Sequence, residues 1–522
     1  MNVAEIAVFV ATVGALAALG FLGASFRRGG RGLEEWAIAG GRFGAVVVWF
    51  LLGADIFTAY TLVSIPSMAF AAGAIVFFAI PYAITFLIAY VAMPALWAEA
   101  RRRSSLTAAE LAAARLGSKL VGLVVALTGI VAVLPYMAVQ IDGMRAVLEV
   151  LLAGVSSART ISEVSLLAAF AVLAAFTFRS GLRGSALGSV LKDVLLWFTV
   201  VALLAVSLSA VGGFRGLFDG LSLDPLPTGD LTLKPKFYAD YVTLAVGSAL
   251  ALYLYPHVFN GVMSSQSPDA IRRSTTLLPL YVIAVGLFAF LGFAAHLMPG
   301  VLRLVSQFPK GEEGLLVVPA MAQVLTPPPL AALMLAGIFV GGMVPAAIMA
   351  IAQANLLVRG VVRPFAALSP EAEEAIAKWA SVFFKFLALG FVFLTPMTYA
   401  IQLQLLGGII ITQTLPAVFL GLTRMRLHPY AVVAGWAVGM VSGVWLTLVA
   451  NHFGQITTTS ISLGGVPVFI GLIALGANLA VVAVGSYAAL ALHRERRRYG
   501  GQRERQQRPH DIGHPEVPDD DP

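Results

Sequence analysis

A hydrophobic segment from Trp49 to Phe70 is long enough to cross a bilayer, yet polar residues interrupt it near its middle. Asp55 is the most informative of them, because a carboxylate near the bilayer centre costs about 2.5–3.5 kcal/mol on insertion scales. Such a residue persists mainly where it faces a polar cavity. Gly53 and Pro66 on either side allow the helix to open, and open backbone offers carbonyl oxygens to an ion or a solute. The segment therefore predicts a binding site within the membrane.

Three hydroxyl residues, Thr58, Thr61 and Ser64, follow Asp55 at steps of three. In a helix this spacing places the three side chains on one face. Hydroxyl groups arranged in this way suit hydrogen bonds to the carboxylate of a bound solute. The alternative is that each hydroxyl bonds back to the carbonyl groups of its own helix. We predict that these three residues bind the solute.

Polar and aromatic residues in other hydrophobic segments are further candidates. His257, in a Tyr-Pro-His sequence, is a candidate gate or proton-carrying group, with a histidine that reaches the membrane interface as the alternative. Tyr253 and Tyr255 are candidates for an aromatic gate, with helix packing as the alternative. Gln140 and Gln413, each inside a spanning segment, join Tyr255 among the predicted solute-binding residues.

The composition is that of a membrane protein. Of the 522 residues 59% are hydrophobic and only 12% are charged, whereas a soluble domain carries roughly 25% charged residues. The chain has no cysteine, which excludes disulfides and thiolate metal sites. Its net charge of +7 comes from basic residues scattered between apolar runs. This scatter argues against a nucleic-acid partner and favours contact with membrane lipid.

The chain contains about thirteen apolar runs of spanning length, which begin near residues 4, 43, 74, 118, 160, 189, 239, 276, 329, 372, 403, 430 and 465. Clusters of Lys and Arg follow the odd-numbered runs. The positive-inside rule then places the N-terminus outside and the C-terminus in the cytoplasm. The Ala- and Arg-rich composition indicates a bacterial inner membrane. We predict a transmembrane domain over residues 1–493 and a disordered cytoplasmic tail over residues 494–522.

The second and seventh runs are the most polar and the most interrupted by Gly and Pro. Because they are five runs apart, they have opposite orientations in the membrane, as an inverted-topology repeat requires. The repeats would cover about residues 43–212 and 239–422. The predicted fold is thus an all-α integral membrane protein with a five-plus-five inverted-repeat core and broken second and seventh spans.

Several short motifs occur in a characteristic order along the chain. They are Gly40-Gly41-Arg42 before the second span, Gly181–Ser185 and Lys192-Asp193 at the sixth, Ser264–Ala270 after the seventh, and Asn355–Phe365 closing the ninth. In order and spacing the chain resembles the sodium/solute symporter family over about residues 4–490. Val344–Asn355 and Tyr255–His257 resemble the branch of that family that moves small monocarboxylates.

The resemblance implies solute uptake driven by sodium, with the ion between the broken second span and the ninth. Backbone carbonyls at the positions of Ala54 and Phe57 would bind it, together with the carbonyl of Gly341. The family's two hydroxyl ligands fall on Val344 and Pro345, which have no side-chain oxygen. This chain therefore departs from the family pattern at the cation site.

Three explanations follow from this departure. Sodium is held by other oxygens, such as those of Asp55 or Thr58; or protons are the coupling ions, with Asp55 or His257 titrating; or transport is uncoupled. A carboxyl or imidazole group in an apolar cavity is shifted toward its neutral form, which suits a proton carrier. Sodium and protons both remain candidates at this point.

The predicted function is secondary active import of a small organic solute, a monocarboxylate such as lactate or pyruvate, by cation-coupled symport. The alternatives are sodium-coupled symport of an amino acid or a vitamin-like solute, and a transporter-like membrane sensor. The spanning segments contain no paired aspartates, Ser/His pair or His-Glu-x-x-His motif, so we predict neither enzyme activity nor a cofactor. The expected partners are the solute, the coupling cation and lipid.

Overall fold

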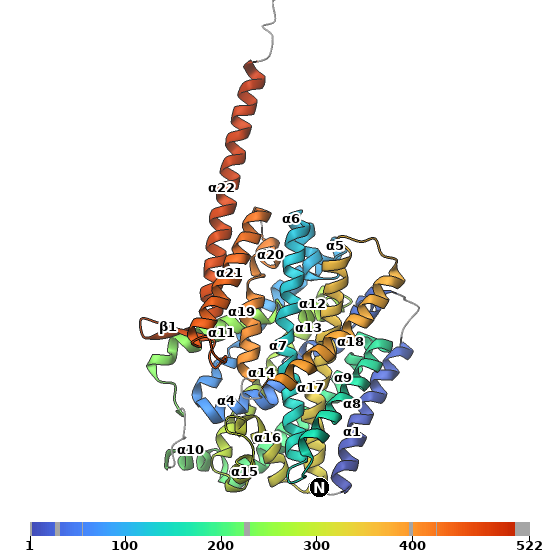
Figure 1. The fold of residues 1–522 in the computed structure, drawn as a ribbon, viewed down its shortest axis with the longest axis vertical. Helices are drawn as coiled ribbons and strands as arrows, with labels where there is room; N and C mark the ends of the chain where they lie inside the picture. The colour runs from blue at the N-terminus through green and yellow to red at the C-terminus, as the bar shows by residue number, and fades with distance from the viewer. Residues whose placement is uncertain are drawn as a thin grey trace, which may run out of the picture.

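The computed structural model of the protein describes residues 3–26, 32–54, 56–223, 230–395, 400–423 and 425–506. Almost all regular structure in these residues is helical (Figure 1). Nine helices in this part of the chain are long and apolar enough to cross a membrane, and two bent helix pairs raise the number to eleven. The shorter interrupted segment α3–α4 and the helix α5 match the two remaining predicted spans. The prediction of an all-α membrane protein is confirmed.

The first half of the core contains the second to sixth predicted spans. Its elements are α3 (Ala45–Gly53), η3 (Tyr60–Ser64), α4 (Ile65–Ala72), η4 (Ala74–Ala79), α5 (Tyr82–Arg102), α6 (Ala108–Leu116), α7 (Lys119–Leu151), α8 (Ala158–Ser180) and α9 (Leu182–Val211). The helix α6 is short and begins with a capping box, in which Thr107 and Glu110 each bond the other's backbone N–H.

The second half contains the seventh to eleventh predicted spans. Its elements are α11 (Tyr238–Leu252), α12 (Pro256–Met263), α13 (Pro268–Leu277), α14 (Pro279–Ala295), α15 (Pro299–Val305), α16 (Glu313–Leu325), α17 (Pro328–Leu356), η6 (Leu357–Val362), α18 (Pro370–Leu394), α19 (Ala400–Thr412), α20 (Leu415–Val418) and η8 (Leu420–Leu422). The breaks in the second and seventh spans therefore lie where the sequence predicts them.

The remaining elements flank or connect the two halves. They are α1 (Val3–Leu22), η1 (Gly23–Phe26), α2 (Leu33–Ile38), η2 (Ala39–Gly41), α10 (Gly213–Leu223), η5 (Pro235–Phe237), α21 (Pro429–Ala450), the hairpin strands β1 (Ser460–Leu463) and β2 (Val466–Phe469), and α22 (Ile470–Gln506). The strands pair antiparallel, with Ser460 opposite Phe469. The helix α22 continues past residue 493 and projects beyond the helical bundle (Figure 1).

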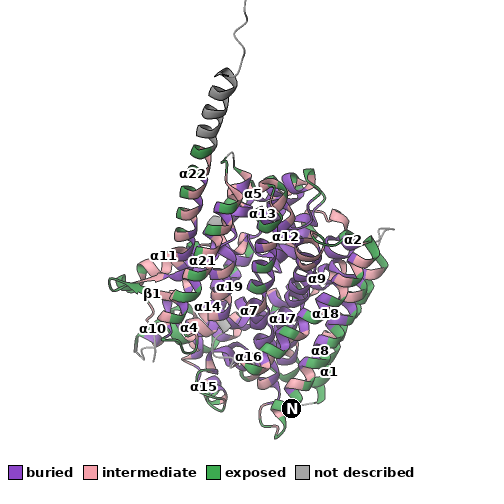
Figure 2. Cartoon of the chain, turned by 45° about the horizontal axis from the view of Figure 1, so that its top comes forward, coloured by how far each residue is buried: buried purple, intermediate pink, exposed green. Residues whose placement is uncertain are grey.

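The core of the bundle is built around α17. Its apolar membrane-length stretch is entirely buried, and it packs against α1, α7, α9 and α18. Purple, buried residues fill the interior in Figure 2, whereas green, exposed ones lie on the outer helices. Many exposed residues on those helices are large and apolar, such as Val201, Trp379 and Val441. An apolar outer surface is expected of helices that face lipid.

Candidate solute and cation site

The second span is interrupted directly after Gly53. The backbone N–H groups of Ile56 and Phe57 both donate to the Gly53 carbonyl, at 3.0 and 2.7 Å, which closes a tight turn. A Cβ atom on Gly53 would lie 2.3 Å from the ring of Tyr281, so only glycine fits here. Asp55, the residue singled out from the sequence, lies outside the described residues.

The helix resumes at Ala59, and two polar side chains satisfy its first backbone N–H groups. The Thr58 hydroxyl oxygen accepts from the N–H of Tyr60 at 3.1 Å, and the Gln140 amide oxygen accepts from the N–H of Ala59 at 3.1 Å. The first N–H groups of a helix have no carbonyl partner within the helix, and an N–H group without a partner inside a membrane costs free energy. Thr58 and Gln140 are fully buried and hold the break in this conformation.

The seventh span is broken between α11 and α12, which are bent by 49°. Pro256 begins α12, where its missing N–H costs no hydrogen bond. Tyr255 precedes it in an extended conformation. Tyr253, at the end of α11, lines a separate narrow cavity with Leu52 and Val258.

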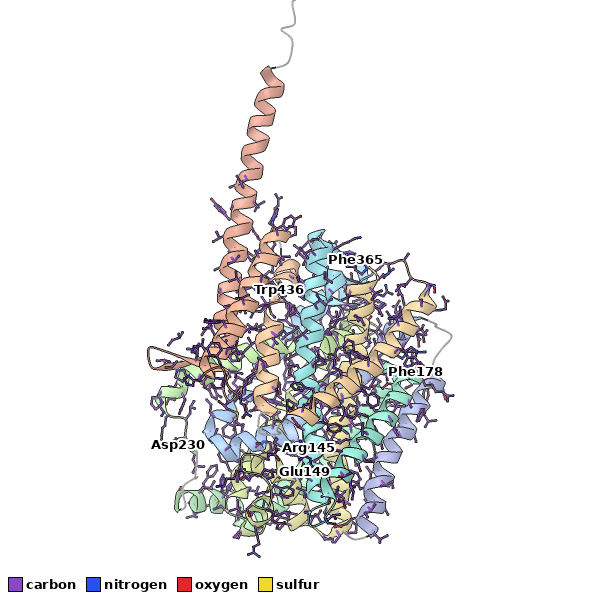
Figure 3. All side chains as sticks on the ribbon, in the orientation of Figure 1. Arg145, Glu149, Phe178, Asp230, Phe365 and Trp436 are labelled. Atoms are coloured by element: carbon purple, nitrogen blue, oxygen red, sulfur yellow. The ribbon has the colours of Figure 1, made fainter. Side chains whose placement is uncertain are left out.

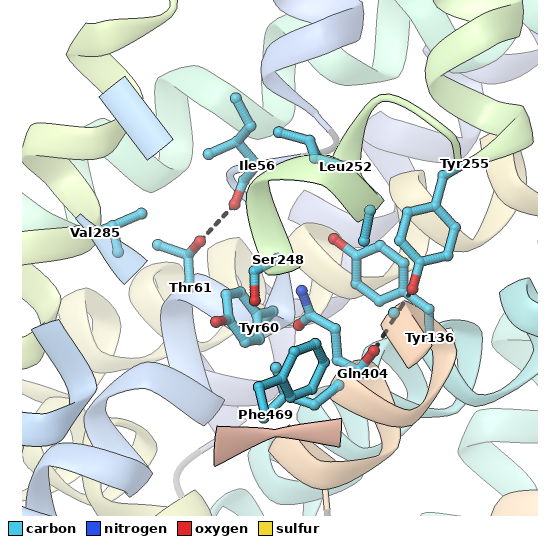
Figure 4. Close-up of a pocket in the computed structure, with 13 residues that line it drawn as sticks. Ile56, Tyr60, Thr61, Tyr136, Ser248, Leu252, Tyr255, Val285, Gln404 and Phe469 are labelled. Atoms are coloured by element: carbon cyan, nitrogen blue, oxygen red, sulfur yellow. Dashed lines mark hydrogen bonds between the residues drawn. The ribbon is translucent and has the colours of Figure 1, made fainter. Parts of the chain in front are cut away.

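A small cavity of about 30 Å³ lies between the two breaks (Figure 4). Its lining comes from the second, fourth, seventh, eighth and eleventh spans and from β2. The lining residues are Ile56, Tyr60, Thr61, Tyr136, Ser248, Ala251, Leu252, Tyr255, Val285, Gln404, Leu405, Gly408 and Phe469. The breaks thus bring together residues that are far apart in the sequence. Of the predicted solute-binding residues, Thr61 and Tyr255 line this cavity.

The polar groups of the cavity come from different helices. The Thr61 hydroxyl donates to the carbonyl of Ile56, and the Tyr255 hydroxyl donates to the carbonyl of Gln404 at 3.5 Å (dashed lines in Figure 4). The hydroxyl of Ser248 is buried and has no hydrogen-bond partner among the described residues. A buried hydroxyl without a partner costs free energy that a bound polar solute can recover. Ser248 belongs to the interrupted seventh span, which is a signal in the sequence that could have identified it.

Three aromatic rings form one wall beside the cavity. The centre of the Tyr136 ring, on α7, lies 5.3 Å from the centre of the Tyr255 ring and 5.6 Å from that of His257. The rings of Tyr255 and His257 stack with their centres 5.2 Å apart. His257 is fully buried. The structure therefore places His257 against two tyrosines inside the helical bundle.

Two other predicted solute-binding residues lie away from the cavity lining. Ser64 is buried in η3. Gln413 lies at a third break, where α19 and α20 are bent by 48°. Its backbone and side-chain oxygens accept from the Asn478 amide at 2.9 and 3.2 Å. Gln413 therefore joins the eleventh span to α22.

A buried ion pair lies beside the break in the second span. The Lys192 ammonium on α9 donates to the Phe57 carbonyl at 2.7 Å and pairs with the Asp193 carboxylate at 2.5 Å. The other Asp193 oxygen accepts from the Tyr281 hydroxyl at 2.6 Å. All four residues are buried, and Lys192 and Asp193 have no exposed surface. The Lys192-Asp193 motif of the sequence therefore lies beside this break, which its position along the chain does not by itself indicate.

The expected cation positions on α17 are also buried. Gly341 lies against the second span, since a Cβ atom on it would lie 2.6 Å from the side chain of Leu62. Val344 and Pro345 supply no side-chain oxygen, and the carbonyl of Phe57 is already bonded to an ammonium. Sodium is a hard cation that needs several oxygen ligands. Of the five expected ligand positions that the structure describes, Phe57, Val344 and Pro345 therefore offer no free oxygen to a sodium ion.

Charged residues gather at the far end of α7. Arg145 and Glu149, which lie close together in Figure 3, form an ion pair at 2.9 Å. They line an open pocket with Arg159 and Glu312. This pocket is charged and lies at the opposite end of α7 from Lys119, so it is separate from the cavity between the breaks.

Comparison with known proteins agrees with this geometry. The sequence profile of the sodium:solute symporter family matches residues 36–411. The chain belongs to this family. It is 36% identical to a monocarboxylate transport permease protein of Rhizobium johnstonii, over 93% of this chain and 96% of that protein. It is 29% identical to the uncharacterized symporter YodF of Bacillus subtilis, over 81% of this chain and 83% of that protein.

The fold of this symporter also matches a solved structure. A Na⁺-coupled sialic acid symporter, in a substrate-bound outward-open state, superposes with a TM-score of 0.72 at 16% identity, covering 93% of this chain and 98% of the other. At this identity the match concerns the fold. Together with the family, it makes this chain a multi-pass membrane protein that carries out cation-coupled symport of a solute. The resemblance inferred from the motifs is confirmed.

Proposed function

We propose that this symporter imports a small monocarboxylate, such as lactate or pyruvate, and binds it in the cavity between the two breaks. A sodium ion or a proton is the coupling cation. The observation that carries the proposal is the cavity itself, which combines small volume, one unpaired hydroxyl and two half-helix starts. The 36% identity to a protein named as a monocarboxylate permease supports the same solute class.

The size and charge of the cavity favour a small acid. A volume of about 30 Å³ corresponds to roughly two water molecules on this scale, so even a small acid has to displace part of the lining, and a larger solute has to displace more of it. None of the thirteen described residues that line the cavity is acidic. Among these residues the ammonium group of an amino acid would find no carboxylate partner, and burying an unpaired charge is costly. This argues against the amino-acid alternative.

The negative charge of the acid is balanced by helix ends. Tyr60 and Tyr255 line the cavity and lie at the starts of η3 and α12. The start of a helix carries a partial positive charge and attracts anions. The Ser248 hydroxyl supplies a hydrogen bond to the carboxylate, and the Thr61 hydroxyl supplies a second when it releases the Ile56 carbonyl. The cotransported cation would complete the charge balance.

The breaks suit an alternating-access mechanism. A solute site at two interrupted helices can open to either side when one repeat moves against the other. Gln140 and Thr58 preserve the hydrogen bonds of the opened backbone, so the break needs no rearrangement to bind solute. In this mechanism the buried α17 and the half-helices around it would move as separate units.

The test is uptake of labelled acids into proteoliposomes. The panel is acetate, lactate, pyruvate, alanine and pantothenate, with sodium and proton gradients imposed separately. We expect lactate or pyruvate to accumulate against its gradient, and neither alanine nor pantothenate to compete. Accumulation of alanine or pantothenate would support the alternative solutes. Failure of every solute to accumulate would support a sensor.

The variant Ser248→Ala tests the cavity directly. Loss of one hydrogen bond to the solute should raise KM by about 3- to 10-fold. The control is Ser209→Ala, since Ser209 is exposed on α9 and bonds only its own helix in the structure. An unchanged KM in Ser248→Ala would remove the cavity from solute binding.

A further inference from the structure

One face of α9 is directed at the part of α17 where the family's sodium ligands would lie. Gly188, Lys192 and Leu196 are spaced by four residues and share this face. A Cβ atom on Gly188 would lie 3.4 Å from the side chain of Val344, and one on Gly341 would lie 3.4 Å from the side chain of Leu196. Lys192 is midway between Gly188 and Leu196 along α9. It therefore lies beside the stretch of α17 between Gly341 and Val344.

The Lys192 ammonium reaches across to the opened second span. It donates to the carbonyl of Phe57, which is one of the expected cation ligands, at 2.7 Å. It also lies 5.7 Å from the centre of the Phe57 ring, within range of a cation–π contact. The Asp193 carboxylate pairs with it at 2.5 Å. A positive charge surrounded by a carbonyl, a carboxylate and an aromatic ring is therefore built into the site.

We propose that the Lys192 ammonium occupies the place of the family's coupling sodium ion, so that this symporter binds no sodium between the broken second span and α17. The Lys192 side chain is a cation attached covalently to the protein. Its ammonium contacts oxygens of Phe57 and Asp193, so no hydroxyl group is needed at the positions of Val344 and Pro345. Replacement of the sodium ion by the ammonium thus explains both the missing hydroxyl groups at Val344 and Pro345 and the presence of Lys192.

The Lys192 ammonium and a sodium ion exclude one another at this place, because the Phe57 carbonyl that would bind the ion already accepts from the ammonium at 2.7 Å. The Asp193 carboxylate is paired with the same ammonium, so it does not neutralise a second cation as well. A plain structural role for the ion pair is a weaker explanation, because a buried ion pair often contributes no more stability than apolar residues of similar volume.

The first arm of the test measures the melting temperature of the purified protein in NaCl and in equimolar KCl. For the wild type we expect the same Tm in both salts. In Lys192→Thr the ammonium is replaced by a hydroxyl, which leaves three oxygen-bearing groups: Thr, the Phe57 carbonyl and the Asp193 carboxylate. This variant should bind sodium, and its Tm should rise by about 2 °C in NaCl relative to KCl.

Two further variants serve as controls. Lys192→Arg keeps the positive charge and should be as indifferent to sodium as the wild type. Lys385 is another fully buried lysine, whose ammonium donates to the Ser381 hydroxyl on α18 at 2.6 Å. Lys385→Thr should therefore show no sodium-specific rise in Tm. A rise in that variant equal to that of Lys192→Thr would overturn the proposal.

The second arm measures uptake and rests on the proposed function. Wild-type proteoliposomes should take up the acid equally with external sodium or potassium at a fixed pH gradient. A sodium-specific rise in the Tm of the wild type, or uptake that requires sodium, would overturn the proposal. If no acid is transported the proposed function fails, but the wild-type Tm still decides the sodium question. If Lys192→Thr does not fold, the Tm of the wild type in NaCl and in KCl still decides whether the protein binds sodium.

Discussion

The Gln140 amide oxygen on α7 accepts a hydrogen bond at 3.1 Å from the backbone N–H of Ala59, the first helical residue after the break in the second span. The Gln140 amide N–H donates in turn to the Tyr136 carbonyl at 3.3 Å on its own helix. One side chain therefore connects the fourth span to the opened second span. The break is stabilised from outside its own helix.

Removing this acceptor should destabilise the break. In Gln140→Met the side-chain volume is kept but the Ala59 N–H loses its partner, which costs about 1–3 kcal/mol for a buried donor. We expect a lower Tm and slower uptake. Gln140→Glu keeps an acceptor oxygen and should retain more of the stability. Equal Tm values for the wild type and Gln140→Met would show that the hydrogen bond does not support the break.

A second prediction concerns the ring that packs on Gly53. The Tyr281 hydroxyl donates to Asp193 at 2.6 Å, and the ring lies 5.5 Å from that of Phe57. Tyr281→Phe keeps the ring but removes a donor from a buried carboxylate, which should cost about 1.5–3 kcal/mol. The loss should appear as a lower Tm.

The matched control is Tyr241→Phe. The Tyr241 hydroxyl donates to the carbonyl of Phe77 at 3.0 Å, and Tyr241 is only partly buried. A neutral hydrogen bond there should contribute about 0.5–1.5 kcal/mol. If the two variants lower Tm equally, Asp193 does not depend on the Tyr281 hydroxyl.

The fold could be predicted largely from the sequence because its causes are local. Apolar runs of membrane length produce spanning helices, and Gly53 and Pro256 interrupt them where polar residues also occur. The third break, at Gln413, had a local signal as well, since Thr412-Gln413-Thr414 precedes Pro416. That signal indicates a candidate polar residue but does not by itself predict a bend.

The site was less predictable because its contacts join distant parts of the chain. Lys192 and Phe57 are 135 residues apart, and Gln140 and Ala59 are 81 apart. No spacing rule relates such pairs. The hydroxyl of Thr58 illustrates the consequence: its type suited a solute ligand, but its position at a helix start makes it a cap.

A third prediction concerns the attachment of α22. The Asn478 amide donates to both oxygens of Gln413 at the bend of the eleventh span. Asn478→Leu should leave these buried oxygens without that donor and lower the Tm, at a cost of about 1–3 kcal/mol. The control is Ser442→Ala, because Ser442 on α21 bonds only its own helix in the structure. An unchanged Tm in Asn478→Leu would show that α22 is held by apolar packing alone.

The last prediction uses two adjacent glycines of α19 that differ in their surroundings. A Cβ atom on Gly407 would lie 2.7 Å from the Ala132 carbonyl oxygen and 2.7 Å from the Tyr255 hydroxyl, whereas one on Gly408 would meet only Ala251, at 3.6 Å. Gly407→Ala must therefore displace α7 or Tyr255, and we expect a lower Tm and little uptake. Gly408 lines the cavity, so Gly408→Ala should fold normally but narrow the solute site.

Uptake kinetics separate narrowing of the solute site, expected in Gly408→Ala, from the displacement expected in Gly407→Ala. In Gly408→Ala the KM for lactate should rise more than the KM for acetate, because the added methyl group excludes the larger acid first. Since the substitution leaves the backbone contacts intact, its Tm should stay within about 1 °C of the wild type. Equal changes in KM for both acids would mean that the cavity beside Gly408 does not select the solute by size. A folded, fully active Gly407→Ala would mean that α19 and Tyr255 lie farther apart in the working protein than they do here.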